Sequence, residues 1–506
     1  MRSVRAALAR TGLEDPSRAE ALLAELAAAG AAPAIERLGS VADPDLALLA
    51  LARIAARPPG RAALAGLAAE PRAYQRLLAV VGGSAALGDH LVRHPEHLAA
   101  LAEPDLLRDA APPPGGAASP QQAWLRARLL RAVGADPAAL APVAATGAPE
   151  PLRLAYRELL LRIAAQDLAC ETPAELFPQV GMALADLATG VLEAALAVAR
   201  AQVEGQAEAR LAVVAMGKTG GRELNYVSDV DVIYVAEPAA GIAEGRALEV
   251  AAQLAGALQR VVFGTALEPP IWQVDPNLRP EGKNGPLVRT LASHLAYYKK
   301  WAQTWEFQAL LKARPAAGDA ALGMAYYQAT RPFVWGAVES PNFVEDAQAM
   351  RRRVEEHVPP AEADRQLKLG PGGLRDVEFS VQLLQLVHGR GDQSLRVAGT
   401  LPALDALCAA GYVGRAPAAR LSQCYRFLRV LEHRLQLHRL KRTHLMPTAP
   451  ADWRRLSRAA GSPGADGALE RAWRETRREV RSLHEELYYR PLLPATAKLS
   501  AGEAVL

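Results

Sequence analysis

Aromatic residues and cysteines are scarce in this chain of 506 residues. Phe, Trp and Tyr make up only 5% of it, and the three cysteines, Cys170, Cys408 and Cys424, form neither a disulfide framework nor a CxxC metal pattern. The opening residues, MRSVRAALAR, lack the long apolar core of a signal peptide. We therefore expect a reduced protein located in the cytoplasm.

Long apolar runs and a strong charge imbalance are absent as well. No stretch of about 18 uncharged apolar residues occurs, so we expect no helix that crosses a membrane. Lys and Arg together number 58 and Asp and Glu 54, which gives a formal net charge of +4 with both signs interleaved. Such a balance does not call for a nucleic acid or an anionic membrane as partner. We expect neither, and the function has to be inferred from a site.

Alanine, leucine and arginine are abundant, and 50% of the residues are hydrophobic, a composition that favours long helices. The length predicts roughly three domains. Apolar residues at helical spacing followed by glycine or proline indicate helices through most of the chain. The clearest helical segments cover 1–109, 152–170, 174–204 and the region from 316 to about 490.

A proline- and glycine-rich stretch, APPPGGAASPQQ at 111–122, predicts a surface loop within the first helical region. We expect an N-terminal helical region at 1–170, a catalytic domain at 171–335 and a C-terminal helical bundle at 336–506.

The hydrophobic period changes only after residue 204. Segments 211–216 and 229–237 are rich in β-branched residues and bounded by turn formers, which predicts two strands. A helix at 243–264 and a further strand within 271–280 follow. This order predicts an α+β fold, mostly helical, with a small mixed sheet embedded between helical regions.

Two carboxylates, Asp229 and Asp231, open the second strand. Side chains alternate faces along a strand, so these two point the same way, roughly 6.5 to 7 Å apart. Magnesium prefers carboxylate oxygens, and a two-metal site can serve phosphoryl chemistry. A D-x-D alone is a weak signal, since Asp43 and Asp45 form another at a predicted helix start, where capping explains it.

The surroundings of the second pair distinguish it from the first. It follows a strand and the glycine-rich GKTGG, whose backbone amides can approach a phosphate. Asp275 would complete the site if its strand neighbours that of Asp231. The alternative is a solvated sheet edge with a flexible turn. The candidate phosphate-binding residues are Gly217, Lys218, Gly220, Gly221 and Ser228.

The stretch GKTGGRELNYVSDVDVIYV at 217–235 resembles the signature of the glutamine synthetase adenylyltransferase and adenylyl-removing enzymes, members of the nucleotidyltransferase superfamily that includes DNA polymerase β. Three further segments resemble the family in the same order: VDPNLRPEGKNGPLV at 274–288, WEFQALLKARPAAGD at 305–319 and LKLGPGGLRDVEFSVQLLQL at 367–386. Thr219, where the family usually has leucine, and Asn277, where it commonly has arginine, depart from the pattern.

The resemblance implies a polymerase-β-like sheet and a specific reaction. Family members carry two such units, one that removes AMP from a tyrosine of glutamine synthetase and one that attaches it. The helical lead-in, the ELNYVSD wording and the tail at 490–506 resemble the amino-terminal, removing unit. Inorganic phosphate would attack the AMP–tyrosine bond and release ADP. Adenylylation by ATP, or a mainly non-catalytic module that binds glutamine synthetase or the PII signal protein, are the alternatives.

The resemblance also implies roles for individual residues. Asp229, Asp231 and Asp275 would hold two Mg²⁺ ions, or Mn²⁺, and act on adenylylated glutamine synthetase, phosphate and an adenine nucleotide. Arg279 and Lys312 would contact phosphate. We predict that Lys312 and Arg314 end a helix, with a solvated helix end as the alternative for this basic pair.

Other residues carry weaker expectations. Trp301 and Trp305, at four-residue spacing, should pack in the core. Around a Gly-Pro-Gly-Gly turn at a helix start lie Lys368, Arg375, Asp376 and Glu378. Anion binding is one interpretation of these residues, and ordinary capping with surface charge is an equally good one. The histidines, among them His294, His357, His388 and His433, show no metal-ligand spacing, so no zinc site is expected.

Overall fold

The computed structural model describes residues 8, 10–107, 119–462, 464–465 and 467–489. The chain divides into two compact units. The first comprises Met1–Ala111, Arg157–Val180 and Arg426–Arg474, and the second Pro112–Tyr156, Gly181–Tyr425 and Glu475–Leu506. The predicted fold class is confirmed, since the protein is mostly helical with one small mixed sheet. The division into three domains stays a prediction.

The first unit is built from helices. Helix α4, Pro44–Ala55, shows why they begin where they do: Asp43 accepts a hydrogen bond from the Leu46 backbone N–H at 2.9 Å, and proline occupies the first helical position. The capping interpretation of this D-x-D is therefore confirmed. The other elements that lie wholly in this unit are α2 (Pro16–Ala28), α3 (Ile35–Leu38), α5 (Pro58–Ala68), α6 (Pro71–Gly83), α7 (Ala85–Arg93), the 3-10 helix Pro95–Leu101 and α20 (Pro450–Ala459).

A buried ion pair holds two distant segments of the first unit together. The Arg434 guanidinium donates to both Asp167 carboxylate oxygens, at 2.6 and 2.7 Å, and both side chains are almost fully buried. Asp167 lies in α9 (Glu150–Leu168) and Arg434 in α19 (Arg415–Arg439). Removing one partner of such a pair leaves an uncompensated buried charge.

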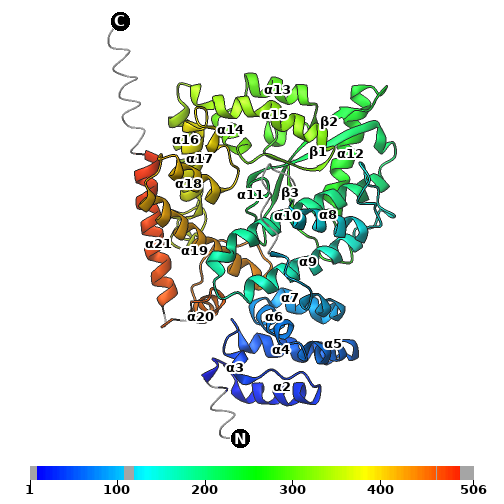
Figure 1. Ribbon diagram of the computed structural model, residues 1–506, viewed down its shortest axis with the longest axis vertical. Coiled ribbons are helices and arrows are strands. Elements are labelled where there is room, and N and C mark those ends of the chain that lie inside the picture. The colour runs from blue at the N-terminus through cyan, green and yellow to red at the C-terminus, as the bar shows by residue number, and fades with distance from the viewer. Residues whose placement is uncertain (1–7, 9, 108–118, 463, 466, 490–506) are drawn as a thin grey trace. The chain divides into compact units, whose positions relative to one another are not determined.

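The mixed sheet forms the centre of the second unit (Figure 1). Its strand order is β3-β2-β1-β5, with β4 also paired to β2. Strand β1 is antiparallel to β2 and β5, whereas β3 and β4 run parallel to β2. The strands are β1 (Ala209–Ala215), β2 (Val230–Pro238), β3 (Val274–Asp275), β4 (Val288–Arg289) and β5 (Arg314–Gly318).

Helices cover the sheet. Helix α12, Glu244–Phe263, packs against β1 and β2, and α15, Ala320–Gly336, packs against β1 and β5. Ile233 and Val235 of β2 share one buried cluster with residues of α13–α17, so the strand face that also carries Asp231 is directed toward those helices. The remaining helices with residues in this unit are α8 (Pro120–Ala132), α10 (Pro173–Gln202), α11 (Gly217–Gly220), α13 (Leu291–Lys300), α14 (Thr304–Leu310), α16 (Phe343–Glu356), α17 (Leu374–His388), α18 (Thr400–Ala409) and α21 (Ala468–His484).

Helix α10 is the one helix of the described residues that is long and apolar enough to cross a membrane. However, 94% of its apolar window is buried inside the protein, as expected for a core helix.

Several expected boundaries need correction. The strand predicted within 271–280 is only Val274–Asp275, and the helix expected to end at Lys312 and Arg314 ends at Leu310, so that Arg314 begins β5. Trp301 does not pack in the core, because its side chain is 62% exposed and Lys300 Nζ lies 4.8 Å above its ring. Trp305 is half-buried.

Two further expectations fall on parts of the chain outside the described residues. They are the loop over residues 111–118 and the tail at 490–506. The rest of the predicted loop starts α8, where Ser119 Oγ accepts from the Gln122 N–H at 3.1 Å.

Candidate active site

The carboxylates of Asp231 and Asp275 lie on neighbouring strands. Strands β2 and β3 run parallel, and Asp231 is directly paired with Asp275 in their register. The Val230 N–H donates to the Gln273 carbonyl at 2.9 Å, which fixes that register. The prediction that the strand of Asp275 neighbours the first acidic pair is confirmed. Asp229 immediately precedes β2 and is half-buried.

Burial, the negative charge of Asp275 and, to a smaller extent, that of Asp229 together raise the pKa of Asp231 to about 6. Lys368 and Arg375 oppose this shift because their positive charges favour the carboxylate. A carboxyl group whose pKa is raised by like charges can be stabilised in its ionised form by an added cation.

No three His, Cys, Asp or Glu side chains among the described residues stand close enough together to hold a metal ion. The donor chemistry of Asp229, Asp231 and Asp275 nevertheless fits a hard divalent cation, because all three supply carboxylate oxygens. The mutual repulsion of Asp231 and Asp275 is the kind that such a cation relieves. Their assignment as magnesium ligands stays a prediction.

A tight glycine turn lies against Asp231. Gly217 has a φ of +52°, and a Cβ atom added there would lie 2.4 Å from Asp231 Oδ2. Only glycine fits both the backbone conformation and this close approach. The Met216 N–H also donates to the Asp231 carbonyl at 2.8 Å, so the turn and the acidic strand are joined through the backbone.

Lys218 is buried beside this turn. Its Nζ donates to Asn225 Oδ1 at 3.3 Å, and Asn225 in turn donates to the Val227 carbonyl at 2.8 Å. Ser228 is half-buried in the segment that leads into Asp229. The structure thus gathers Lys218 and Ser228 near the acidic strand, as the sequence predicts, and their contact with phosphate stays a prediction.

Gly220 and Gly221 serve close packing. A Cβ atom on Gly220 would lie 1.9 Å from the Lys312 carbonyl, and one on Gly221 would lie 3.2 Å from the Ala398 carbonyl. Arg314 donates to the Gly220 and Thr219 carbonyls at 3.2 and 3.1 Å. Arg314 is half-buried and donates hydrogen bonds to the carbonyl end of α11, so it lies against the turn rather than at a solvated helix end.

Lys312 is engaged with protein groups. Its Nζ forms an ion pair with the buried Glu223 and donates to Thr400 Oγ1 at 3.3 Å. Glu223 also accepts the Thr400 backbone N–H at 2.8 Å. These contacts tie β5 to the start of α18, and the predicted phosphate contact of Lys312 is not tested by them.

Arg279 is buried and holds the loop after β3. Its guanidinium donates to the carbonyls of Pro276 at 2.9 Å and of Gly285 at 3.1 Å. Asp275 Oδ1 accepts the Asn277 N–H at 2.8 Å, a turn that ends the strand. Arg279 thus shapes the loop beside Asp275, and its contact with phosphate stays a prediction.

A second group of charges, from the segment 368–378, faces the same site. Arg375 Nη1 donates to Glu378 Oε2 at 3.0 Å, and Glu378 is fully buried. Burial alone would raise the pKa of Glu378, but the charges of Arg375, Lys218, Lys312 and Lys368 lower it to about 2. Residues from the glycine turn and from α17 therefore meet around one buried anion.

Sequence reasoning missed several residues that build the site. Glu223 and Thr400 fix Lys312, and the buried Asp186 on α10 pairs with Arg222, whose φ is +53°. The uncommon arginine conformation has no signature in the sequence. The one available signal was the position of Glu223, an acidic residue between the glycine turn and the strand. A charged residue that is buried at such a place needs a partner of opposite charge.

Two protein-family models match this chain. The glutamate-ammonia ligase adenylyltransferase family model matches residues 74–329, and the PII-uridylyltransferase model matches residues 348–488. This chain belongs to the glutamate-ammonia ligase adenylyltransferase family. The first match includes Asp229, Asp231 and Asp275, together with the glycine turn.

Curated relatives agree with this assignment. Bifunctional glutamine synthetase adenylyltransferase/adenylyl-removing enzymes of Streptomyces avermitilis and Streptomyces coelicolor are 53% and 52% identical to it, over 99% of this chain and 48% of each relative. That of Leifsonia xyli subsp. xyli is 48% identical over 99% of this chain and 50% of its own length. The chain thus spans about half the length of the curated relatives it matches.

Proposed function

We propose that this chain removes AMP from the adenylylated tyrosine of glutamine synthetase by phosphorolysis, which yields ADP and the unmodified tyrosine. The observation that carries the proposal is the pairing of Asp231 with Asp275 on parallel strands, beside the Gly217 turn and within the field of Lys368 and Arg375. Negative ligands and positive charges side by side suit a reaction between two phosphate groups.

The reaction exchanges one bond at phosphorus for another. An oxygen of inorganic phosphate forms a bond to the α-phosphorus while the bond from that phosphorus to the tyrosine oxygen breaks. The tyrosine leaves as a phenolate and then takes a proton from solvent. Both phosphates are anions, so the site has to position them in line and offset their charge.

The residues divide this work. Gly217 lets the backbone approach a phosphate closely, and Lys218, Lys368 and Arg375 supply positive charge. Asp229, Asp231 and Asp275 would hold two Mg²⁺ ions, for which Mn²⁺ is a substitute. Bound magnesium supplies stabilisation of the charge on the attacking and leaving oxygens.

The proposed direction of the reaction rests on the amino-acid sequence around the site. The ELNYVSD segment and the helical lead-in resemble the removing unit of the family, whereas acidic strand and glycine turn would serve adenylylation equally well. The printed names of the relatives include both activities. We therefore choose an experiment that distinguishes the directions.

The experiment measures ADP release when the chain is mixed with adenylylated glutamine synthetase, Mg²⁺ and phosphate. A parallel reaction contains unmodified synthetase and labelled ATP. Asp229→Ala is the test variant, and Asp45→Ala, from the other D-x-D, is the matched control. We expect ADP that requires phosphate, is lost in Asp229→Ala and persists in Asp45→Ala.

Two results would reject the proposal. Label transferred from ATP to the synthetase, without phosphorolysis, would assign the opposite reaction. Binding of the synthetase with neither reaction would make the chain a recognition module.

The match of residues 348–488 to the PII-uridylyltransferase model supports a further partner. We propose that this segment contacts the PII signal protein. Calorimetric titration of the chain with PII tests this, and the absence of any binding heat at concentrations up to about 100 μM would contradict it.

A further inference from the structure

The loop at residues 366–373 packs against α21 at Gly372, where there is no room for a side chain. Gly372 has a φ of +72°, and a Cβ atom there would lie 2.0 Å from the Arg477 carbonyl. A Cβ atom on Gly373 would lie 2.8 Å from the Leu367 carbonyl. The loop backbone is therefore compact and in direct contact with the α21 backbone at Arg477.

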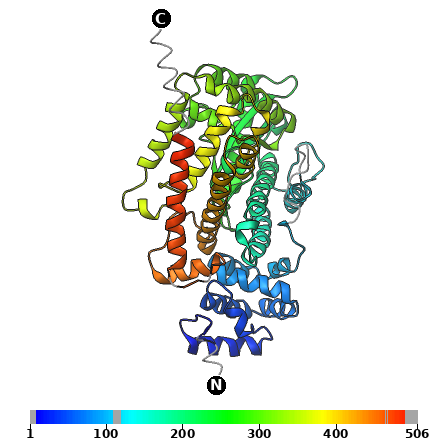
Figure 2. The ribbon, with the colours of Figure 1, turned by 60° about the vertical axis from the view of Figure 1, so that its left-hand side comes forward.

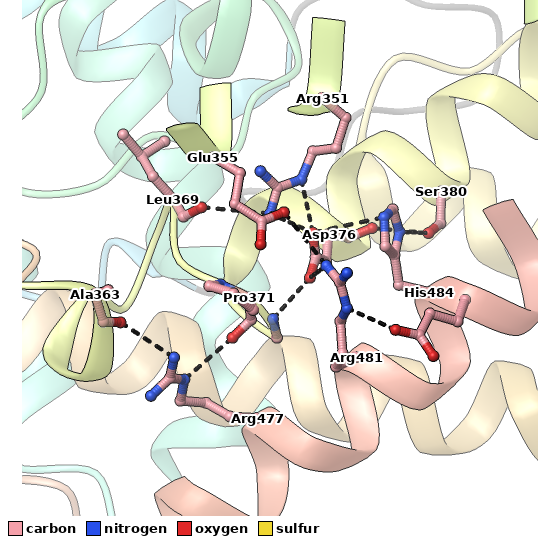
Figure 3. A network of polar contacts seen from close by, with 12 residues as sticks. Arg351, Glu355, Ala363, Leu369, Pro371, Asp376, Ser380, Arg477, Arg481 and His484 are labelled. Atoms are coloured by element: carbon pink, nitrogen blue, oxygen red, sulfur yellow. Dashed lines mark hydrogen bonds and ion pairs between the residues drawn. The ribbon is translucent and has the colours of Figure 1, made fainter. Parts of the chain in front are cut away.

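The Arg477 side chain donates to three carbonyls, two in the 3-10 helix Ala363–Arg365 that precedes the loop and one in the loop itself. Its Nη1 donates to Asp364 at 2.7 Å, its Nη2 to Ala363 at 3.2 Å and its Nε to Pro371 at 3.2 Å. Figure 3 shows the guanidinium between the Ala363 and Pro371 carbonyls. The rigid fork of an arginine can bond several acceptors at once, which a single amine cannot do.

Asp376 fixes the C-terminal end of the loop, next to Pro371. Its carboxylate accepts the Gly372 N–H at 2.7 Å and Arg351 Nε at 2.7 Å, and all of these groups are buried. Arg351 Nη2 also donates to the Leu369 carbonyl at 3.3 Å. Asp376 is thus a buried anchor for the loop, which decides between the two interpretations of this acid in favour of a structural role.

Helices α17 and α21 lie side by side, as Figure 2 shows in yellow and red. Ser380 Oγ lies 2.8 Å from His484 Nδ1, and His484 Nε2 lies 3.6 Å from Asp376 Oδ1. Figure 3 places Arg481 and His484 of α21 on either side of Asp376. Asp376 and Arg477 therefore belong to one network of polar contacts.

The loop carries two cations of the candidate site. The Arg375 N–H donates to the Lys368 carbonyl at 3.0 Å, so the backbone of one positions the other. Arg375 Nη1 is held against the buried Glu378 by an ion pair at 3.0 Å. Lys368 and the turn residue Lys218 act on the same carboxylate, so the cations of the loop and of the glycine turn meet around Glu378. Arg477 is not among the charges that lower the pKa of Glu378, and it donates instead to the carbonyls of Ala363, Asp364 and Pro371.

We propose that Arg477 is a positioning residue that holds the loop at 366–373 so that Lys368 and Arg375 face the phosphate-binding side of the site. The ligand class is a phosphate anion, either inorganic phosphate or the phosphates of an adenine nucleotide. The expected change in the KM for phosphate rests on the proposed function. The expected change in the Kd for ADP holds for either direction of the reaction.

The test compares Arg477→Gln with Lys368→Gln and with the double variant in the whole chain. Arg478→Gln is the matched control, since Arg478 is the next residue of α21 and is exposed. The measurements are the Kd for ADP with Mg²⁺ present, the KM for phosphate and kcat. We expect Arg477→Gln and Lys368→Gln each to raise Kd and KM about tenfold, with little change in kcat.

The double variant shows whether the two residues act through one another. If Arg477 acts by positioning Lys368, the Kd of the double variant for ADP should be no higher than that of the single variant with the higher Kd. Effects that multiply, or an Arg477→Gln protein that binds ADP like wild type, would overturn the proposal. Arg477→Lys should recover little affinity, because one amine cannot bond the three carbonyls together.

Hydrogen exchange separates positioning from general loss of structure. Arg477→Gln should speed exchange of the amides at 366–376 and leave those of β1 and β2 at the wild-type rate. Faster exchange throughout the second unit would show a merely structural role and overturn the proposal. A wild-type chain that binds ADP but produces none from adenylylated synthetase rejects the proposed function, while the ADP affinities still decide the role of Arg477.

Discussion

Glu378 shows how the charges of this site depend on one another. Its carboxylate is fully buried, yet positive charges from Arg375, Lys218, Lys312 and Lys368 lower its pKa to about 2. An acid whose pKa is lowered on folding stabilises the folded state above its unfolded pKa, near 4.5. The stabilisation is then lost as the pH falls toward 2.

We predict that Glu378→Gln lowers the free energy of unfolding by about 2 to 3 kcal/mol at pH 7. The cause is the loss of a buried negative charge that offsets several neighbouring cations. Urea unfolding at pH 7 and at a series of values from pH 4.5 downward measures this. The difference from wild type should shrink as the pH falls, and a penalty independent of pH would show that packing, not charge, is responsible.

Asp231→Asn should abolish the reaction and spare the fold. The amide removes the negative charge that would bind magnesium, so we expect kcat to fall at least about 100-fold. The same change relieves the repulsion from Asp275, so unfolding by urea in EDTA should show no loss of stability. A destabilised but active variant would contradict the assigned role. EDTA should inactivate the wild type, and Mg²⁺ or Mn²⁺ should restore it.

For single residues, the sequence predicted those site residues that lie close to one another in the chain. Asp229, Asp231 and Lys218 lie within a single stretch, and Asp231 lies on β2 as expected, whereas Asp229 immediately precedes that strand. The partners of Lys312 could not be predicted, because Glu223 is 89 residues away in the chain and Thr400 is 88. Arg279 bonds carbonyls of its own loop, an arrangement that depends on backbone geometry and leaves no pattern in residue types.

Among the elements, those with a clear period were predicted well. The strand expected at 229–237 is Val230–Pro238, and the helix expected at 243–264 is Glu244–Phe263. The strand within 271–280 is short because Pro276 and the turn at Asn277 end it. Strand β5 was missed because RPAAG holds no β-branched or aromatic residue, and only its pairing with β1 makes it a strand.

The short helix α11 offers a test of packing by one element. Gly220→Ala should lower the free energy of unfolding by several kcal/mol, because the new Cβ atom would lie 1.9 Å from the Lys312 carbonyl. Gly245→Ala in α12 is the matched control. Gly245 is exposed with open space around it, so alanine should stabilise the helix by about 0.5 to 1 kcal/mol. Equal effects in thermal unfolding would refute this reading of the turn.

For the molecule as a whole, the accessibility of the three cysteine thiols to a labelling reagent measures folding independently of activity. Cys424 is buried, and burial together with the nearby Glu479 carboxylate raises the pKa of its thiol to about 12. We predict that a thiol reagent at pH 8 titrates all three cysteines in denaturant but leaves Cys424 unmodified in the native protein. Rapid native labelling of Cys424, located by peptide mass, would show that α19 opens readily.

The parallel pairing of β2 with β3 has a consequence for how the protein acquires its activity. Asp231 and Asp275 stand on opposite sides of α12 in the chain, so the two acids meet only after that helix has crossed over and packed on the sheet. An antiparallel hairpin could unite two acids through a local turn within microseconds. Here the acids instead unite by a non-local step, so the recovery of activity on refolding should trail the recovery of helical signal.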